Sequence, residues 1–277
     1  MMSKPLPPDQ PAPEPDASTL VGGGLWQPDG HIRQTSWDIP VEVPVALNIN
    51  TDAYAVMLCT PQDLHDFARG FILSEAILPG PEAIQAITID QREQGIQIDI
   101  QARASSIARQ ALRQRKLAGR SGCGLCGVQS LHDTLRPMPR LPDRPGISPQ
   151  AVLRGFAQLP ANQPIKQCNR SVHGAAWCDA EGNILLSRED VGRHNALDKL
   201  IGALSVSGFD RADGFVVLSS RCSYELVQKA ASVGIPALAT LSAPTSLALN
   251  LARQANLQLS AKCGDGVIHF NQHSTKS

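Results

Sequence analysis

The chain has 277 residues, of which 42% are hydrophobic and 18% charged, and this ordinary globular composition excludes a wholly disordered protein. Its 25 basic and 25 acidic residues give a net charge of zero, which argues against nucleic acid as the main partner. No run of 18 apolar residues predicts a membrane span, no secretory signal is recognisable, and the seven cysteines lack the spacing of a disulfide framework, so we expect a cytoplasmic protein.

The first part of the chain divides into a tail and a small domain. Residues 1–35 are rich in proline, glycine and small polar residues, and we expect a disordered tail there. Residues 36–117 are typical of an α+β domain, in which a helix follows Thr60 as its cap and Pro61 in its first turn. Apolar residues then recur at helical spacing from Leu64 to Ile72. The four strands expected in this domain are 43–50, 53–60, 83–90 and 95–102.

The second part of the chain alternates between strands and helices. Residues 118–147 form a Cys-x-x-Cys loop and a linker, and residues 148–277 form an α/β domain that would bind a cofactor. Such alternation predicts a partly parallel sheet covered by helices, so the fold class is α/β with a smaller N-terminal α+β domain. We expect Ser223 to cap one helix and Pro244 to start another. The expected helices are 151–159, 193–204, 223–233 and the segment after Pro244, and the expected strands are 171–178, 183–190, 214–219, 235–240, 257–261 and 267–270.

Cys123 and Cys126 are separated by two residues in a glycine-rich loop. The glycines allow both sulfur atoms to face outward, and Arg120 with the basic residues before it favours thiolate over thiol. A structural zinc site uses the same spacing but needs a second pair of ligands, and the sequence has no second Cys-x-x-Cys. The pair is therefore interpreted as reactive thiols, with a zinc knuckle and a chemically inert loop as alternatives.

Charged residues cluster where the strand ending at Asp190 passes into the next helix. Gly192 suits the turn, and Arg193, His194 and Asn195 occupy the first helical turn, where free N–H groups bind anions such as phosphate. A capped, salt-bridged helix start without a ligand is the alternative. Two later strand-to-helix turns carry hydroxyl residues at the carboxyl ends of strands, which favours a phosphate-bearing nucleotide. Their polar residues are Ser219, Ser220, Arg221, Ser223, Ser242, Thr245 and Ser246.

Four segments carry a family resemblance. GCGLCG at 122–127, EDVGRHNALDKLIG at 189–202, SSRCSYELVQKA at 219–230 and GIPALATLSAPTSLALNLA at 234–252 occur in an order and spacing that resemble the formate dehydrogenase accessory sulfurtransferases, the FdhD family. The resemblance runs from about Pro40 to the C-terminus. It implies a cytoplasmic homodimer with a cytidine-deaminase-like C-terminal half. It also implies that Cys123 or Cys126 accepts sulfur from a cysteine desulfurase as a persulfide. The sulfur would pass to molybdenum in bis(molybdopterin guanine dinucleotide), for formate dehydrogenase as the client, and GDP would mimic part of that cofactor.

The resemblance further implies which residues act. Cys123 and Cys126 are the catalytic pair, with Cys123 favoured as the persulfide bearer because Arg120 lies nearer to it. His173, on an expected strand, is equally compatible with a hydrogen-bonded core histidine. The chain departs from the family pattern at NRSVHGAA, residues 169–176, and at SAKCGDGV, residues 260–267. The implied cofactor-binding residues are His173, Asp190, Gly192, Arg193, His194, Asn195, Ser219, Arg221, Ser223, Ser242, Thr245, Ala261, Lys262, Cys263, Gly264, Asp265 and Gly266.

Three rival functions start from the same motifs. The first is a dithiol oxidoreductase that cycles the Cys-x-x-Cys pair between thiol and disulfide, although no thioredoxin-like βαβ pattern leads into the motif. The second is a non-catalytic chaperone that binds the molybdenum cofactor and carries no sulfur. The third is a zinc hydrolase of the deaminase type, for which the sequence lacks the His-x-Glu and paired cysteine ligands.

Overall fold

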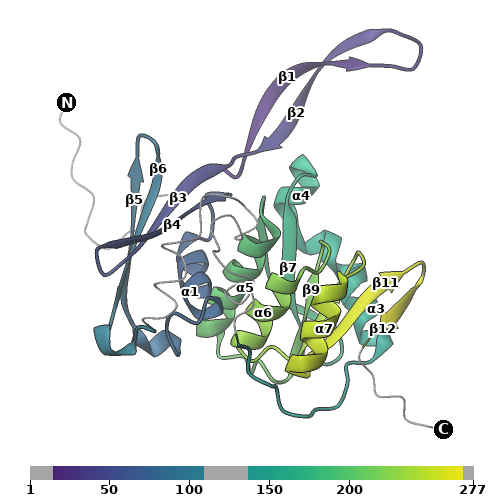
Figure 1. The fold of residues 1–277 in the computed structure, drawn as a ribbon. Helices are drawn as coiled ribbons and strands as arrows, with labels where there is room; N and C mark the ends of the chain where they lie inside the picture. Colours follow the sequence, from purple (N-terminus) through teal and green to yellow (C-terminus); the bar gives the residue numbers. More distant parts are fainter. Residues whose placement is uncertain (1–14, 109–136, 271–277) are drawn as a thin grey trace.

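A computed structural model describes residues 15–108 and 137–270, which form three sheets, two of them packed against helices (Figure 1). The structure confirms the α/β class, and most helices and strands lie within a few residues of the predicted ranges. Cys123 and Cys126 fall outside the described residues. No helix in the described part of the chain is both long and apolar enough to cross a bilayer.

A long β-hairpin replaces much of the expected disordered tail. β1 (Ser18–Trp26) and β2 (Ile32–Pro40) pair over nine residues each, and the hairpin extends away from the rest of the molecule in Figure 1. The prediction of disorder over residues 1–35 is therefore wrong from Ser18 onward, while residues 1–14 lie outside the described ranges. The physical reason is that the prolines end at Pro15, and the threonine, valine, leucine and tryptophan residues that follow are suited to strands despite the glycines between them.

The N-terminal sheet has the strand order β4-β3-β6-β5. It is built from β3 (Val43–Ile49), β4 (Asp52–Cys59), β5 (Ile84–Arg92) and β6 (Gly95–Ala102), and η1 (Pro81–Ala83) and η2 (Ala104–Ser106) flank its last two strands. The helix α1 (Leu64–Ser74) begins later than predicted, after Asp63. Thr60 does not cap it, because the Thr60 hydroxyl accepts a hydrogen bond of 3.1 Å from the backbone N–H of Val191, in the other half of the chain.

The C-terminal sheet has the strand order β12-β11-β10-β9-β7-β8. β9 (Gly214–Leu218), β10 (Ala237–Thr240) and β11 (Gln258–Cys263) are parallel, whereas β7 (His173–Asp179), β8 (Ile184–Asp190) and β12 (Gly266–His269) join antiparallel. Helices cover both faces of this sheet. The connecting helices are α3 (Pro149–Gln158), η4 (Leu159–Asn162), α4 (Pro164–Asn169), α5 (Arg193–Ser207), α6 (Tyr224–Ser232) and α7 (Ser246–Ala255).

Helices α1 and α5 join the two halves. A side-chain carbon at Gly70 would lie 1.6 Å from the backbone oxygen of Asp198, and one at Gly202 would lie 1.9 Å from that of Asp66. Two glycines therefore let the helices cross with their backbones in contact. One buried hydrophobic cluster contains residues of both sheets and of α1, α5, α6 and α7, while α3 packs in a smaller cluster on the opposite face of the C-terminal sheet.

Candidate functional site at the carboxyl edge of the C-terminal sheet

The strand directions bring the predicted turns to one edge of the C-terminal sheet. The parallel strands β9, β10 and β11 all end there. Because β7 runs antiparallel to β9, its first residue, His173, lies at the same edge, directly paired with Asp190 at the end of β8. The N-termini of α5, α6 and α7 follow β8, β9 and β10, so three sets of free helix N–H groups also face this edge.

Hydrogen bonds between the turns fix their relative positions. The Ser219 hydroxyl accepts a hydrogen bond of 2.8 Å from the backbone N–H of Gly174, whose carbonyl accepts one of 2.9 Å from the N–H of Ser219. The N–H of Thr245 donates to the carbonyl of Cys222 at 3.0 Å. Thr245 also caps α7, since its hydroxyl accepts a hydrogen bond from the N–H of Ala248, so α7 begins after Thr245 and not at Pro244. The edge is consequently preformed.

Several cations gather at this edge. Burial lowers the pKa of His173, and the positive charges of Lys166, Arg193 and His194 lower it further. The three cations therefore act on a single imidazole, and Arg193 also acts on the thiol of Cys222. Positive charge beside free helix N–H groups is the pattern of an anion-binding surface. Lys166 was absent from the predicted set.

Lys166 reaches the edge through α4. The carboxylate of Glu189 accepts hydrogen bonds of 2.8 Å and 3.0 Å from the backbone N–H groups of Ile165 and Lys166, and so anchors the start of α4 to the end of β8. Burial raises the pKa of Glu189, although these hydrogen bonds oppose the rise. The position of Lys166 depends on this contact across 23 residues, and no local motif in the sequence signals it.

His194 belongs to a small polar cluster with two residues of the next turn. Its Nε2 atom lies 2.9 Å from a carboxylate oxygen of Glu225 and 3.3 Å from the hydroxyl of Ser223. The Ser223 hydroxyl donates to Glu225 at 3.1 Å and does not cap α6, contrary to our expectation. Burial alone would raise the pKa of Glu225, but hydrogen bonding and charge from His194, with Ser223 and Arg193, hold it below its ordinary value. Glu225 is a second residue that the predicted set lacked.

Asp190 and Asn195 serve the interior of the molecule. The fully buried carboxylate of Asp190 lies 2.7 Å from the Nζ atom of Lys199 and accepts hydrogen bonds from the N–H groups of Thr60 and Gly192 and from the amide of Asn195. The same amide of Asn195 donates to the carbonyl of Leu58 at 2.8 Å. These contacts place the start of α5 against the N-terminal domain. The structure thus gives both side chains a positioning role for the turn that carries Arg193 and His194.

The remaining predicted residues differ in their exposure. Arg221, Ser242 and the turn from Lys262 to Gly266 are exposed at the edge, and Ala261 is buried in β11, where it pairs with Ile268. Gly264 has a φ of 54° at the tip of this turn, a conformation that favours glycine. The exposed residues of the turn can meet a ligand, whereas the side chain of Ala261 can act only through packing.

The described cysteines fall into two groups. Cys59, Cys178 and Cys222 are buried, and burial raises the pKa of Cys178 and of Cys222 to about 12, so these thiols are poor nucleophiles. Burial also raises the pKa of Cys59. Cys168 and Cys263 are exposed, and Cys263 lies at the carboxyl edge. Within residues 15–108 and 137–270 we find no group of three or more histidine, cysteine or acidic residues that could hold a metal ion.

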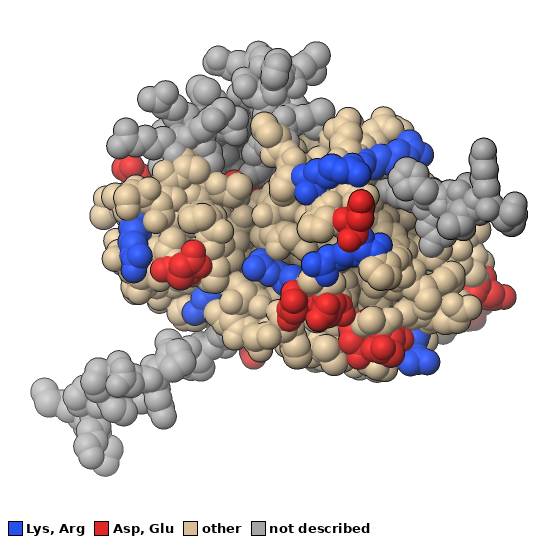
Figure 2. Space-filling model, turned by 90° about the horizontal axis from the view of Figure 1, so that it is seen from below, with Lys and Arg blue, Asp and Glu red and all other residues tan. Residues whose placement is uncertain are grey.

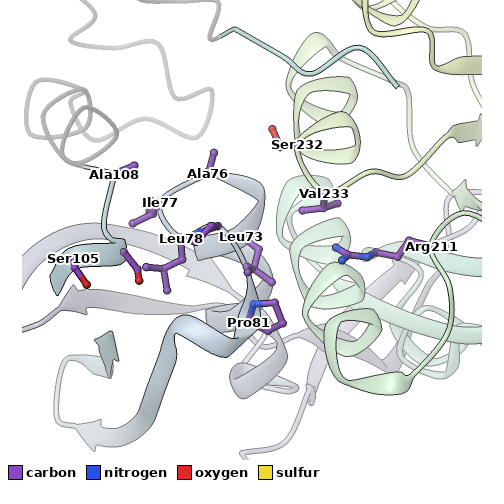
Figure 3. Close-up of a pocket in the computed structure, with 13 residues that line it drawn as sticks. Leu73, Ala76, Ile77, Leu78, Pro81, Ser105, Ala108, Arg211, Ser232 and Val233 are labelled. Atoms are coloured by element: carbon purple, nitrogen blue, oxygen red, sulfur yellow. The ribbon is translucent and has the colours of Figure 1, made fainter. Parts of the chain in front are cut away.

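A cavity of about 600 Å³ lies at the opposite edge, between the end of α1 and the end of α6 (Figure 3). Its apolar walls are formed by Leu73, Ile77, Leu78 and Val233. The cation Arg211, which lies just before β9, also lines the cavity. It contains none of the predicted site residues. The surface seen from below in Figure 2 carries basic and acidic residues interspersed, in agreement with the zero net charge. The carboxyl edge, with its clustered cations, is therefore the better candidate for an anionic ligand.

The mixed sheet and its covering helices place the chain among the α/β proteins, in which ligands commonly bind outside the carboxyl ends of strands. Comparison with protein families is more specific. The model of the FdhD/NarQ family matches residues 40–274, and the chain belongs to this family.

Individual relatives agree with this assignment. The chain is 48% identical to the sulfur carrier protein FdhD of Variovorax paradoxus, over 84% of each chain. It is 44% identical to the protein of the same name from Cupriavidus necator, over 92% of this chain and 89% of the relative. A crystal structure from Desulfotalea psychrophila, described as a proposed formate dehydrogenase accessory protein, matches with a TM-score of 0.70. That match covers 93% of this chain and 98% of the other at 23% identity, and it supports the fold.

Proposed function

We propose that this protein is a cytoplasmic sulfurtransferase that takes persulfide sulfur from a cysteine desulfurase and delivers it to the molybdenum cofactor required by formate dehydrogenase. The observation that carries the proposal is the relationship over most of the chain to proteins named sulfur carrier protein FdhD. The carboxyl edge of the C-terminal sheet supports the proposal because positive charge gathers there. The Cys-x-x-Cys pair supplies thiols suited to sulfur transfer.

The proposed chemistry uses the two cysteines of residues 122–127. The thiolate of one cysteine attacks the outer sulfur of the donor's persulfide, forms a new S–S bond, and releases the donor cysteine as a thiolate. Attack by the second cysteine on the inner sulfur would then release hydrosulfide and leave a Cys123–Cys126 disulfide. Direct transfer of the outer sulfur would leave the thiols reduced. Either route moves one sulfur atom per loading, and the disulfide route then needs a dithiol reductant to restore the two thiols. The oxidation state of the pair after transfer distinguishes the routes.

The cargo would be bound at the carboxyl edge. Bis(molybdopterin guanine dinucleotide) carries pyrophosphate groups, and the N-terminus of α5 with Arg193, His194 and the neighbouring Lys166 offers N–H groups and positive charge to such anions. The hydroxyl-bearing turns around Ser242 and Thr245 lie on the same edge. We place at least one guanine nucleotide of the cargo there.

Sulfur loading is tested by mass spectrometry of the peptides of the protein. After incubation with a cysteine desulfurase and cysteine, the peptide that contains Cys123 and Cys126 should gain the mass of one sulfur atom. Cys123→Ser and Cys126→Ser are examined singly and together, with Cys168→Ser as a control for an exposed thiol elsewhere. Full loading of both single variants and of the double variant would refute the proposal. A disulfide that reduces general protein substrates without carrying sulfur would instead favour the dithiol oxidoreductase.

Nucleotide binding is tested with GDP. Saturating GDP should raise the melting temperature, because a ligand selective for the native state stabilises it. Arg193→Ala should weaken binding roughly tenfold or more, because an anion loses a charge-assisted partner. Arg211→Ala is the matched control, since this arginine lies in the cavity at the opposite edge. Persulfide formation should survive Arg193→Ala. Unchanged melting in saturating GDP, or equal losses for both arginine variants, would contradict this placement.

A further inference from the structure

The cavity between the ends of α1 and α6 resembles a small-molecule site in its size and lining. Its volume of about 600 Å³ lies within the range of about 300–1,000 Å³ that is usual for such sites. Leu73 and Leu78 come from the N-terminal half of the chain and Val233 from the C-terminal half, so both halves contribute apolar walls. Leu73 and Leu78 also belong to the main hydrophobic cluster, and Val233 packs against it. The apolar body of a ligand would therefore extend a core that already exists.

At both helix ends, backbone carbonyls are hydrogen-bonded within the chain. The carbonyl of Leu73, in the last turn of α1, accepts a hydrogen bond of 2.9 Å from the N–H of Ala76. The carbonyl of Ala231, in the last turn of α6, accepts one of 3.1 Å from the N–H of Gly234. Such bonds satisfy carbonyls that would otherwise give the end of a helix a negative potential. The charge of the lining is therefore set mainly by its side chains.

Arg211 gives this lining one positive charge. It is the single charged side chain among the described residues that line the cavity, and it points toward Val233 in Figure 3. In the described part of the chain, no carboxylate lies within ion-pair distance of its guanidinium group. The carboxylate of the neighbouring Asp210 instead accepts a hydrogen bond of 2.8 Å from the N–H of Ala212. A half-buried guanidinium group without a carboxylate partner is suited to pair with the carboxylate of a ligand.

From these features we propose that the cavity binds a small organic acid that has one carboxylate and an apolar body. The carboxylate pairs with Arg211, and the body lies against Leu73, Leu78 and Val233. One cation matches one negative charge, whereas several cations gather at the carboxyl edge of the C-terminal sheet. The site lies at the opposite edge and does not depend on the proposed sulfur transfer. Because both halves of the chain line the cavity, the bound acid would stabilise the contact between them.

Isothermal titration calorimetry of the full chain with octanoate tests the proposal. Octanoate should bind with a Kd below about 1 mM, and octanamide, which has the same carbon chain without the charge, should bind at least about tenfold more weakly. Arg211→Met should weaken octanoate binding by a similar factor. Arg253→Met, which removes an exposed cation of α7, is the matched control and should bind octanoate like the parent. Far-ultraviolet circular dichroism checks that both variants fold.

Two further variants locate the ligand independently of Arg211. Ser232→Trp adds a large side chain from the half-buried end of α6 and should abolish octanoate binding by filling the cavity. The carboxylate of Glu82 lies against Gly80 of the lining and opposes an anion, so Glu82→Gln should strengthen octanoate binding. Absence of octanoate binding, equal affinity for octanoate and octanamide, or unchanged affinity in Arg211→Met or Ser232→Trp would each overturn the proposal. Displacement of octanoate by GDP would place the acid at the carboxyl edge and overturn it as well.

Discussion

Replacement of Lys199 by methionine should remove several kcal/mol from the free energy of unfolding. Both the ammonium group of Lys199 and the carboxylate of Asp190 are fully buried, and the two lie 2.7 Å apart. Lys199 also donates to the carbonyl of Thr60 at 2.9 Å. Methionine has a similar volume but no charge, so Asp190 would keep a buried negative charge without a cation. Breaking one side of such a pair costs about 3–5 kcal/mol.

Urea unfolding followed by circular dichroism measures this loss, and the melting temperature should fall by about 6–20 °C for a chain of this size. Arg253→Met is the matched control: this cation is exposed, and its removal should change the stability by less than about 0.5 kcal/mol. The double variant Asp190→Asn/Lys199→Met should recover part of the loss, because the unpaired charge is gone. A loss below about 1 kcal/mol in Lys199→Met would refute the claim that Lys199 stabilises the buried carboxylate of Asp190.

Two further predictions concern other contacts. Gly70→Ala would place a carbon 1.6 Å from the carbonyl oxygen of Asp198, so α1 and α5 must separate, and we expect a loss of about 3 kcal/mol, the upper end of the usual overpacking cost. Gly266→Ala has ordinary clearance and should unfold like the parent, and equal stability of the two variants would contradict the crossing. Glu225→Gln should destabilise the protein at pH 7. Because the pKa of Glu225 is lowered in the folded state, the stability that it contributes is present above the ordinary glutamate pKa of about 4.3 and is lost as the pH falls through the folded-state value. Urea unfolding between pH 7 and pH 3 should therefore show the difference from the parent disappearing on acidification, and a constant difference would argue against the His194 contact.

Local sequence patterns predicted most of the regular structure. The alternation in residues 95–102 coincides with β6, and the apolar spacing from Leu64 to Ile72 lies within α1. The hairpin was missed because its glycines outweighed its strand-forming residues in a reading by composition. Thr60 was misassigned because its hydroxyl bonds to Val191, a partner 131 residues away that no local rule can anticipate.

The candidate site could be predicted as a set of turns but not as an arrangement. Three turns meet because parallel strands end on the same side of a sheet. This meeting can be predicted once the alternation of strands and helices in the sequence is recognised. The roles within the set depend on tertiary contacts. Asp190 has the sequence signature of a ligand-binding turn residue, yet its carboxylate is occupied by four donors within the protein. Lys166 enters the site only because Glu189 anchors α4.

Because α1 packs against α5, the polypeptide cannot be divided into two fragments without exposing its hydrophobic core. Expressed alone, the first half would leave Phe67 and Phe71 in water, and the second would leave Leu197 and Leu200 uncovered. Each fragment would then be prone to aggregate. Any shortened version for crystallisation or engineering should keep both halves on one chain and be truncated only at its termini.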